Sequence, residues 1–132
     1  KAICSSPNNV VVHGIPDTRP LMNRDIVNFD VAVFYEGYYG DCSAMVLIGE
    51  VDDAGHLLCK TTKECVYKAI DIVKPGLPLE VIAETVTKHA ATHGFNIIPD
   101  FCGHFIGRYI KTHKNTKNIT KHLFVQLFST LF

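Results

Sequence analysis

Apolar and polar residues alternate most clearly between residues 25 and 51. Two runs rich in β-branched and aromatic residues, DIVNFDVAVFY and YYGDCSAMVLIGEV, flank the pair Glu36-Gly37. Two such runs separated by two turn-forming residues predict a β-hairpin. The two-residue loop also sets the register of the strands: Tyr35 would lie opposite Tyr38, Ala32 opposite Asp41, and Asp30 opposite Ser43.

Two amphipathic helices are predicted after the hairpin. Apolar residues recur at helical spacing in residues 57–73 and again in residues 78–94, and a glycine stop ends each pattern. Residues 1–24 contain several prolines and predict loops, with one short strand at residues 10–12. Strands followed by helices indicate an α+β fold, in which two helices pack on one face of an antiparallel sheet.

The composition narrows the class of protein. The 132 residues suffice for one domain with a single core, and 13 Lys and Arg residues balance 13 Asp and Glu residues. The net charge therefore gives the chain no preference for nucleic acid or for an anionic membrane. Five cysteines without C-x-x-C spacing favour reduced thiols and an intracellular protein, either cytoplasmic or organellar. No apolar run reaches the ~18 residues of a membrane-spanning helix, so we expect no membrane association.

The two aspartates of the hairpin stand out, because half-buried strands ordinarily carry apolar or β-branched residues. In the predicted register Asp30 and Asp41 project from the same face as diagonal neighbours, roughly 7–8 Å apart at the backbone. Two carboxylates in a partly buried place need a proton, a cation or hydrogen-bond donors between them. A divalent metal is the simplest such group. A solvated face or a hydrogen-bonded turn is the alternative for either aspartate.

His104 is the third candidate for a metal site. It follows Gly103 in the segment DFCGHFIGR, which is short and extended enough to lie beside the hairpin. A neutral imidazole together with two carboxylates suits Mn, Fe, Co or Zn better than Mg or Ca. A lone histidine beside a glycine is more often a packed or hydrogen-bonded residue, so the residues alone leave both interpretations open.

Three segments resemble a known family. CSSPNNVVVHGIPDTRPL, DIVNFDVAVFYEGYYGD and GFNIIPDFCGHFIGR, in this order and at this spacing, resemble the type I methionine aminopeptidases, metallopeptidases of family M24, from Lys1 to Arg108. The resemblance implies the pita-bread fold, of which this chain would form largely the first half. It also implies an enzyme that removes N-terminal methionine from proteins and peptides. The implied cofactors are divalent metal ions (Co, Mn, Fe or Zn), two per site in the family.

The resemblance also implies roles for individual residues. Asp30 and Asp41 would be metal ligands, with Asp41 bridging two ions as a bidentate carboxylate, and His104 would ligate the metal nearest the substrate. His13 would be the catalytic and substrate-binding histidine, which contacts the substrate amide and stabilises the tetrahedral intermediate. Cys4 would line the pocket for the methionine side chain, because a sulfur lining accepts a thioether by soft, polarizable contact.

The sequence departs from the family pattern in several places. Two further glutamate ligands of the family, one of them its general base, have no counterpart because no Asp or Glu follows Asp100. Three of five ligands favour one bound metal over two and predict weak or no catalysis by this chain alone. Lys111 stands where the family has a histidine, and Arg24 where it usually has glycine. We expect a partial aminopeptidase-like domain at residues 1–108 and a divergent basic, then apolar, segment at residues 109–132.

A non-catalytic pita-bread module that binds a protein or the ribosome is the alternative function. The basic residues between 108 and 121 would suit such a role, although we interpret them as a solvated segment in preference to a nucleic-acid contact. The presence of both aspartates together with His104 and His13 favours the peptidase, since a binding module has no physical need for that set. The apolar end, residues 123–132, is where a dimer contact would be sought.

Overall fold

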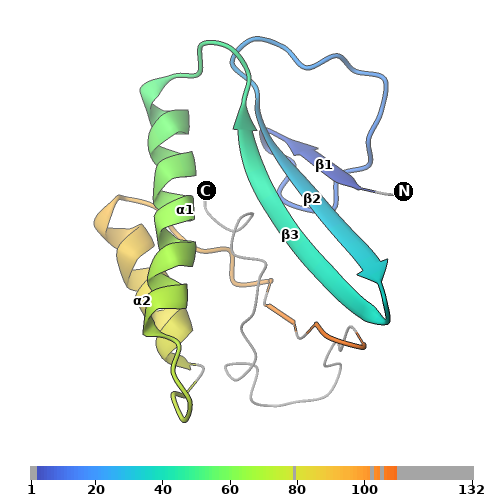
Figure 1. Cartoon of the computed structure of the whole chain (residues 1–132). Coiled ribbons are helices and arrows are strands. Elements are labelled where there is room, and N and C mark those ends of the chain that lie inside the picture. The colour runs from blue at the N-terminus through green and yellow to red at the C-terminus, as the bar shows by residue number, and fades with distance from the viewer. Residues whose placement is uncertain (1–2, 79, 102, 105, 110–132) are drawn as a thin grey trace.

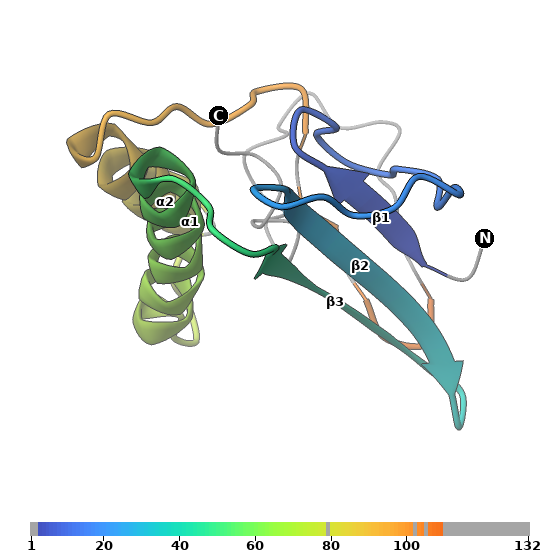
Figure 2. The same ribbon diagram turned by 90° about the horizontal axis from the view of Figure 1, so that it is seen from above.

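The computed structural model describes residues 3–78, 80–101, 103–104 and 106–109. Its elements follow one another in the order β1 (Cys4–Pro7), β2 (Ile26–Tyr35), β3 (Tyr38–Leu47), α1 (Asp53–Ile72) and α2 (Glu80–Thr92). The strands form one antiparallel sheet in the order β1-β2-β3. Both helices lie on one side of the sheet, near the end of β3 from which the chain leaves (Figure 1, Figure 2).

Two expectations concern the C-terminal residues of the chain. Apart from Tyr109, the divergent segment predicted at residues 109–132 lies outside the described residues, and so does the apolar stretch proposed as a dimer contact. Among the helices that the structure describes, none is both long enough and apolar enough to cross a bilayer.

The hairpin of β2 and β3 confirms the predicted register. Glu36 and Gly37 have φ values of 47° and 86°, so both central residues of the turn are left-handed, as a type I′ turn requires. The Cα partners of the two strands are the predicted ones: Tyr35 with Tyr38, Ala32 with Asp41, and Asp30 with Ser43. The local turn chemistry therefore determines which residues face each other along both strands.

The strand predicted at residues 10–12 is wrong, because these residues form a loop. The N-terminal strand is β1 instead, and it pairs with β2 so that Cys4 lies opposite Asp30. β1 is short and ends at Pro7, so it offers little of the alternation from which a strand is recognised in sequence. Its existence depends on the hydrogen bonds that the neighbouring strand provides.

The two helices agree with the sequence pattern and enclose the core. α1 begins one turn earlier than predicted, because the Asp52 carboxylate caps it by accepting a hydrogen bond from the Gly55 amide at 2.8 Å. Buried side chains from both helices form one cluster: Cys65, Ala69, Ile82, Val86 and Ala90. This cluster fixes α2 against α1 and therefore fixes the relative positions of the polar side chains on the two helices.

Arg24 occupies the turn that leads into β2, with a left-handed φ of 79°. The turn is held by a 2.8 Å hydrogen bond from the Arg24 amide to the Ile48 carbonyl. A side chain at such a φ costs roughly 1–2 kcal/mol, which glycine does not incur. The Arg24 guanidinium lies 3.8 Å from Asp52 Oδ2, but both side chains are exposed, so this ion pair contributes little.

We therefore predict that Arg24→Gly increases the free energy of unfolding by about 0.5–1 kcal/mol, after allowance for the greater entropy of glycine in the unfolded chain. Urea denaturation of the two proteins measures the difference. Arg24→Ala is the matched control: it also removes the ion pair but keeps the Cβ atom, so it should give no gain. An unchanged or lower stability of the glycine variant would show that the turn carries no strain.

Asp25 anchors the N-terminal loops to the start of β2. Its buried carboxylate accepts two hydrogen bonds from Arg19, at 2.9 and 3.0 Å, one from the Met22 amide at 2.9 Å and one from Asn8 Nδ2 at 2.8 Å. The Arg19 guanidinium, then the Met22 amide and Asn8, hold the pKa of Asp25 well below its ordinary value. The charged form of Asp25 is therefore the form that the fold stabilises.

This anchor predicts a pH dependence of stability. Because the pKa of Asp25 is lower in the folded chain than in the unfolded chain, its contribution is present above the unfolded value of about 4 and is lost as the pH falls below it. Asp25→Asn should lower Tm at pH 7 and flatten the fall of Tm between about pH 5 and pH 2. Thermal denaturation followed by circular dichroism tests this. Glu50→Gln, which removes an exposed carboxylate, should leave the slope near that of the parent. Equal slopes for the parent and Asp25→Asn would contradict the anchor.

Candidate metal centre

Asp30 and Asp41 lie on the same face of the sheet. Asp41 is opposite Ala32, and Ala32 is two residues from Asp30 on the same strand, so the two carboxylates project in the same direction as predicted. Along β3, every second residue from Tyr39 to Leu47 is half-buried and the residues between them are exposed. Asp41 belongs to the half-buried set, and its side chain is only 12% exposed. The sheet therefore presents this carboxylate on its more enclosed face.

The segment that carries His104 lies along β3, as predicted. The Tyr39 amide donates a 2.7 Å hydrogen bond to the Gly107 carbonyl. At the neighbouring residues of the two segments, Arg108 Nε donates to the Tyr38 hydroxyl at 3.2 Å. The Arg108 guanidinium also lies 5.4 Å from the centre of the Tyr38 ring. Residue numbers rise along this segment as they fall along β3. The segment thus runs antiparallel to β3 and carries His104 toward Asp41.

His104 and Asp41 are in direct contact. His104 Nε2 lies 3.1 Å from Asp41 Oδ2, and the two side chains are 18% and 12% exposed. Metal–ligand distances of ~2.0–2.2 Å place two ligands of one cation about 3–3.5 Å apart, so this spacing fits a shared ion. A carboxylate oxygen and an imidazole nitrogen are also the donors that divalent transition metals accept. The pair is therefore suited to hold such an ion without a large movement.

The other two predicted residues lie beside β1. Cys4 is the Cα partner of Asp30, so its side chain projects from the face that carries the aspartates. His13 precedes Gly14, which pairs with β1: the Ser5 amide donates to the Gly14 carbonyl, and the Gly14 amide donates to Ser6 Oγ, both at 3.1 Å. A Cβ atom on Gly14 would overlap the Ser5 carbonyl oxygen, so this close approach requires glycine. The loop holds the exposed His13 next to the strand that carries Cys4.

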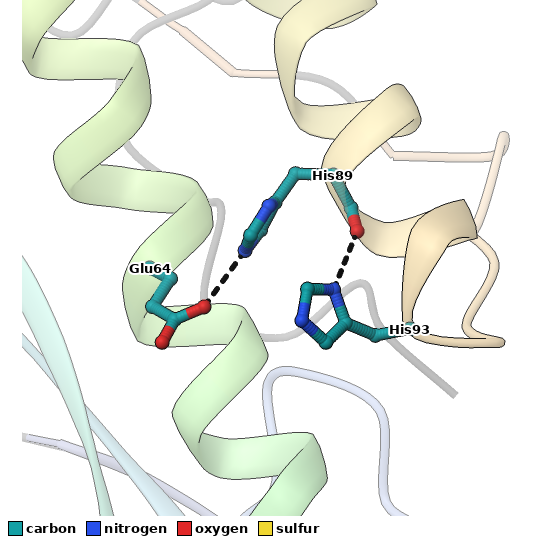
Figure 3. Close-up of side chains that lie close together, drawn as sticks. All are labelled: Glu64, His89 and His93. Carbon is teal, nitrogen blue, oxygen red and sulfur yellow. Dashed lines mark hydrogen bonds and ion pairs between the residues drawn. The ribbon is translucent and has the colours of Figure 1, made fainter.

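A second group of potential ligands was missed by the sequence reasoning. Glu64 of α1, His89 of α2 and His93 just after α2 place their ligand atoms within 4.8 Å of one another (Figure 3). The spacing of His89 and His93, four residues apart on a predicted helix, was a usable signal that they share a face. Glu64 carried no such signal, because its approach depends on how the two helices pack.

Comparisons with known proteins agree with the resemblance. Residues 1–126 match the model of metallopeptidase family M24. The chain is 47% identical over 104 residues to the methionine aminopeptidase of Chlamydia pneumoniae, covering 79% of this chain and 36% of that protein. It is 48% identical over 106 residues to the mitochondrial methionine aminopeptidase 1D of Danio rerio, covering 80% of this chain and 31% of that protein. The chain thus spans about a third of the length of these curated relatives.

The fold is shared with a solved member of the family. The crystal structure of methionine aminopeptidase from Rickettsia prowazekii superposes with a TM-score of 0.79 at 42% identity, covering 81% of this chain and 43% of that chain. This likeness confirms the α+β, pita-bread expectation for the sheet and the two helices. Members of the family are metallopeptidases, so a divalent metal is the cofactor that the match implies. Because the family model covers most of the chain, and because the fold and two relatives agree with it, the chain belongs to metallopeptidase family M24.

Proposed function

We propose that this chain takes part in the hydrolytic removal of N-terminal methionine from peptides and proteins. The observation that supports this most strongly is the 3.1 Å contact between His104 and Asp41, on the face of the sheet that also carries Asp30 and Cys4. Methionine aminopeptidase is also the name of the relatives at 47% and 48% identity. Mn, Fe, Co and Zn all suit the donor set, and availability selects among them.

The residues have distinct proposed roles. Asp41 and His104 hold the metal, and Asp30, from the same face, provides a further carboxylate. A bound divalent cation supplies a water of lowered pKa and stabilises the negative charge that develops on the scissile carbonyl oxygen. His13 contacts the substrate amide from the loop that pairs with β1. Cys4 lies beside Asp30 and lines the pocket for the thioether. The shared face of Asp30, Asp41 and Cys4 and the contact of His104 with Asp41 support these roles.

The number of metal ions follows from the ligands present. Within these 132 residues no Asp or Glu follows Asp100, so two aspartates and one histidine make up the proposed set. Three protein ligands with open positions are the usual composition of a single catalytic metal site. We therefore propose one ion for this chain, with slower turnover than a two-metal site. Ribosome association stays a prediction from the basic segment, most of which lies outside the described residues.

Release of methionine from a Met-Ala-Ser peptide by the purified chain, titrated with Mn²⁺ and with Co²⁺, tests the proposal. Asp41→Asn should reduce metal-dependent release by about 100-fold or more, because changes even in residues that only support a ligand typically cost 10–100-fold. Glu50→Gln is the matched control, since it removes an exposed carboxylate away from the centre and should retain the parental rate.

Calorimetry with Mn²⁺ shows what an absence of methionine release means. If the parent binds Mn²⁺ by calorimetry, Asp41→Asn binds it more weakly and neither releases methionine, the metal centre stands but this chain does not catalyse. If Asp41→Asn cleaves the peptide as fast as the parent, the proposed role of Asp41 is wrong.

A further inference from the structure

Glu64, His89 and His93 form a compact, partly buried group where α1 and α2 pack together. Glu64 comes from α1 and the two histidines from α2 and the turn after it, and Figure 3 shows both imidazole rings on the side of α2 that faces Glu64. The ring centres of the histidines are 4.6 Å apart. The apolar cluster between the helices holds the two backbones in place beneath this group. The group is therefore a product of the tertiary fold.

The hydrogen bonds of His93 determine which of its nitrogens can bind a cation. His93 Nδ1 lies 3.0 Å from the backbone carbonyl oxygen of His89. A carbonyl oxygen only accepts hydrogen bonds, so the tautomer with its proton on Nδ1 satisfies this contact and presents the lone pair of Nε2. The Thr92 hydroxyl, which donates to the same carbonyl oxygen at 2.7 Å, lies 3.2 Å from Nδ1. Metal-binding histidines are typically oriented in this way, with the second ring nitrogen donating to a carbonyl or a carboxylate. In that tautomer His93 has the orientation of a metal ligand.

His89 and Glu64 supply the other two donors. His89 Nε2 lies 2.9 Å from Glu64 Oε2, and the side chains are 13% and 37% exposed. The hydrogen bond with His89 lowers the pKa of the Glu64 carboxyl, so the carboxylate is charged at neutral pH. One carboxylate oxygen and two imidazole nitrogens make a donor set suited to zinc and related divalent metals. The ligand atoms would need to approach one another from at most 4.8 Å to about 3–3.5 Å, which side-chain rotation can provide.

The charged neighbours restrict which cation can bind. The group borders a surface hollow that is also lined by Lys60, Lys63, Tyr67, Lys68 and Asp71. Lys60 Nζ lies 4.0 Å from Glu64 Oε1. These ammonium groups oppose any cation whose binding relies mainly on charge, such as Mg²⁺ or Ca²⁺, which prefer sites rich in carboxylates. A metal bound through imidazole nitrogen depends less on net charge, so the surroundings favour zinc, cobalt or nickel.

We propose that Glu64, His89 and His93 form a second divalent transition-metal site, separate from the centre at Asp41 and His104, in which zinc links α1 to α2. Binding needs the Nε2 lone pair of His89, so the single proton of the neutral ring lies on Nδ1 in the metal-bound form, and no net proton is released. Three protein ligands and one water complete a tetrahedral site. A metal in this position ties Glu64 of α1 to the end of α2, so it stabilises the helix pair.

The test separates the two sites by mutation. In the Asp41→Asn, His104→Gln background, calorimetry with Zn²⁺ should show one bound equivalent, and Zn²⁺ should raise Tm where Mg²⁺ does not. Adding His93→Gln should weaken zinc binding at least about tenfold. Adding His56→Gln instead, a change at an exposed histidine near the start of α1, should leave binding unchanged. Absence of zinc binding in the background protein, or equal binding with and without His93, overturns the proposal.

A measurement on the unmutated chain guards against failure of the variants to fold. Histidine ring ¹⁵N resonances, recorded as Zn²⁺ is added, report which nitrogen binds the metal. Nε2 of His93 and of His89 should shift while Nδ1 of His93 remains protonated. Shifts confined to His104 and His13, with those of His89 and His93 unchanged, would overturn the second site.

Discussion

A slip of one residue between β2 and β3 would turn Asp41 to the opposite, exposed face of the sheet, because side chains alternate along a strand. The two-residue turn at Glu36 and Gly37 prevents this slip, since both residues adopt the left-handed conformations that a type I′ turn needs. The same register determines which backbone groups of β3 hydrogen-bond to the segment that carries His104. The proposed metal centre therefore depends on the geometry of one tight turn.

The two groups of potential ligands depend on different parts of the molecule. Asp41 and His104 meet through the backbone pairing of β3 with the segment near Gly107. Glu64 and His89 meet through the packing of α1 on α2, whose shared core includes Cys65 and Val86. A change in the hairpin register would disrupt the first group and leave the second in place. The two sites can for this reason be tested independently.

Sequence reasoning succeeded where the deciding interactions are local. The register of the hairpin, and with it the common face of Asp30 and Asp41, follows from the length and residue types of a single turn. The presence of both helices follows from apolar periodicity and stop signals, whereas the start of α1 is set by the Asp52 cap. The proximity of His104 to the hairpin was predicted from the extended character of its segment, and the structure gives it a partner at 3.1 Å.

The features that sequence reasoning missed all depend on contacts between distant residues. β1 is a strand because β2 pairs with it, whereas the valine-rich residues 10–12 pair with no strand among the described residues and form a loop. The hydrogen bonds of Asp25 to Asn8 and Arg19 join loops that show no mutual pattern in the sequence. Glu64 is one of several charged residues on its helix, and only the packing of α2 distinguishes it.

The hairpin register and the segment at His104 together form the proposed metal site. Anomalous diffraction at the manganese edge, from crystals of the chain grown with Mn²⁺, shows whether an ion binds there. We expect an anomalous peak roughly 2.0–2.3 Å from a carboxylate oxygen of Asp41 and from His104 Nε2, on the face of the sheet that also carries Asp30. Absence of an anomalous peak between Asp41 and His104, with the two side chains still in contact, would contradict the proposed site.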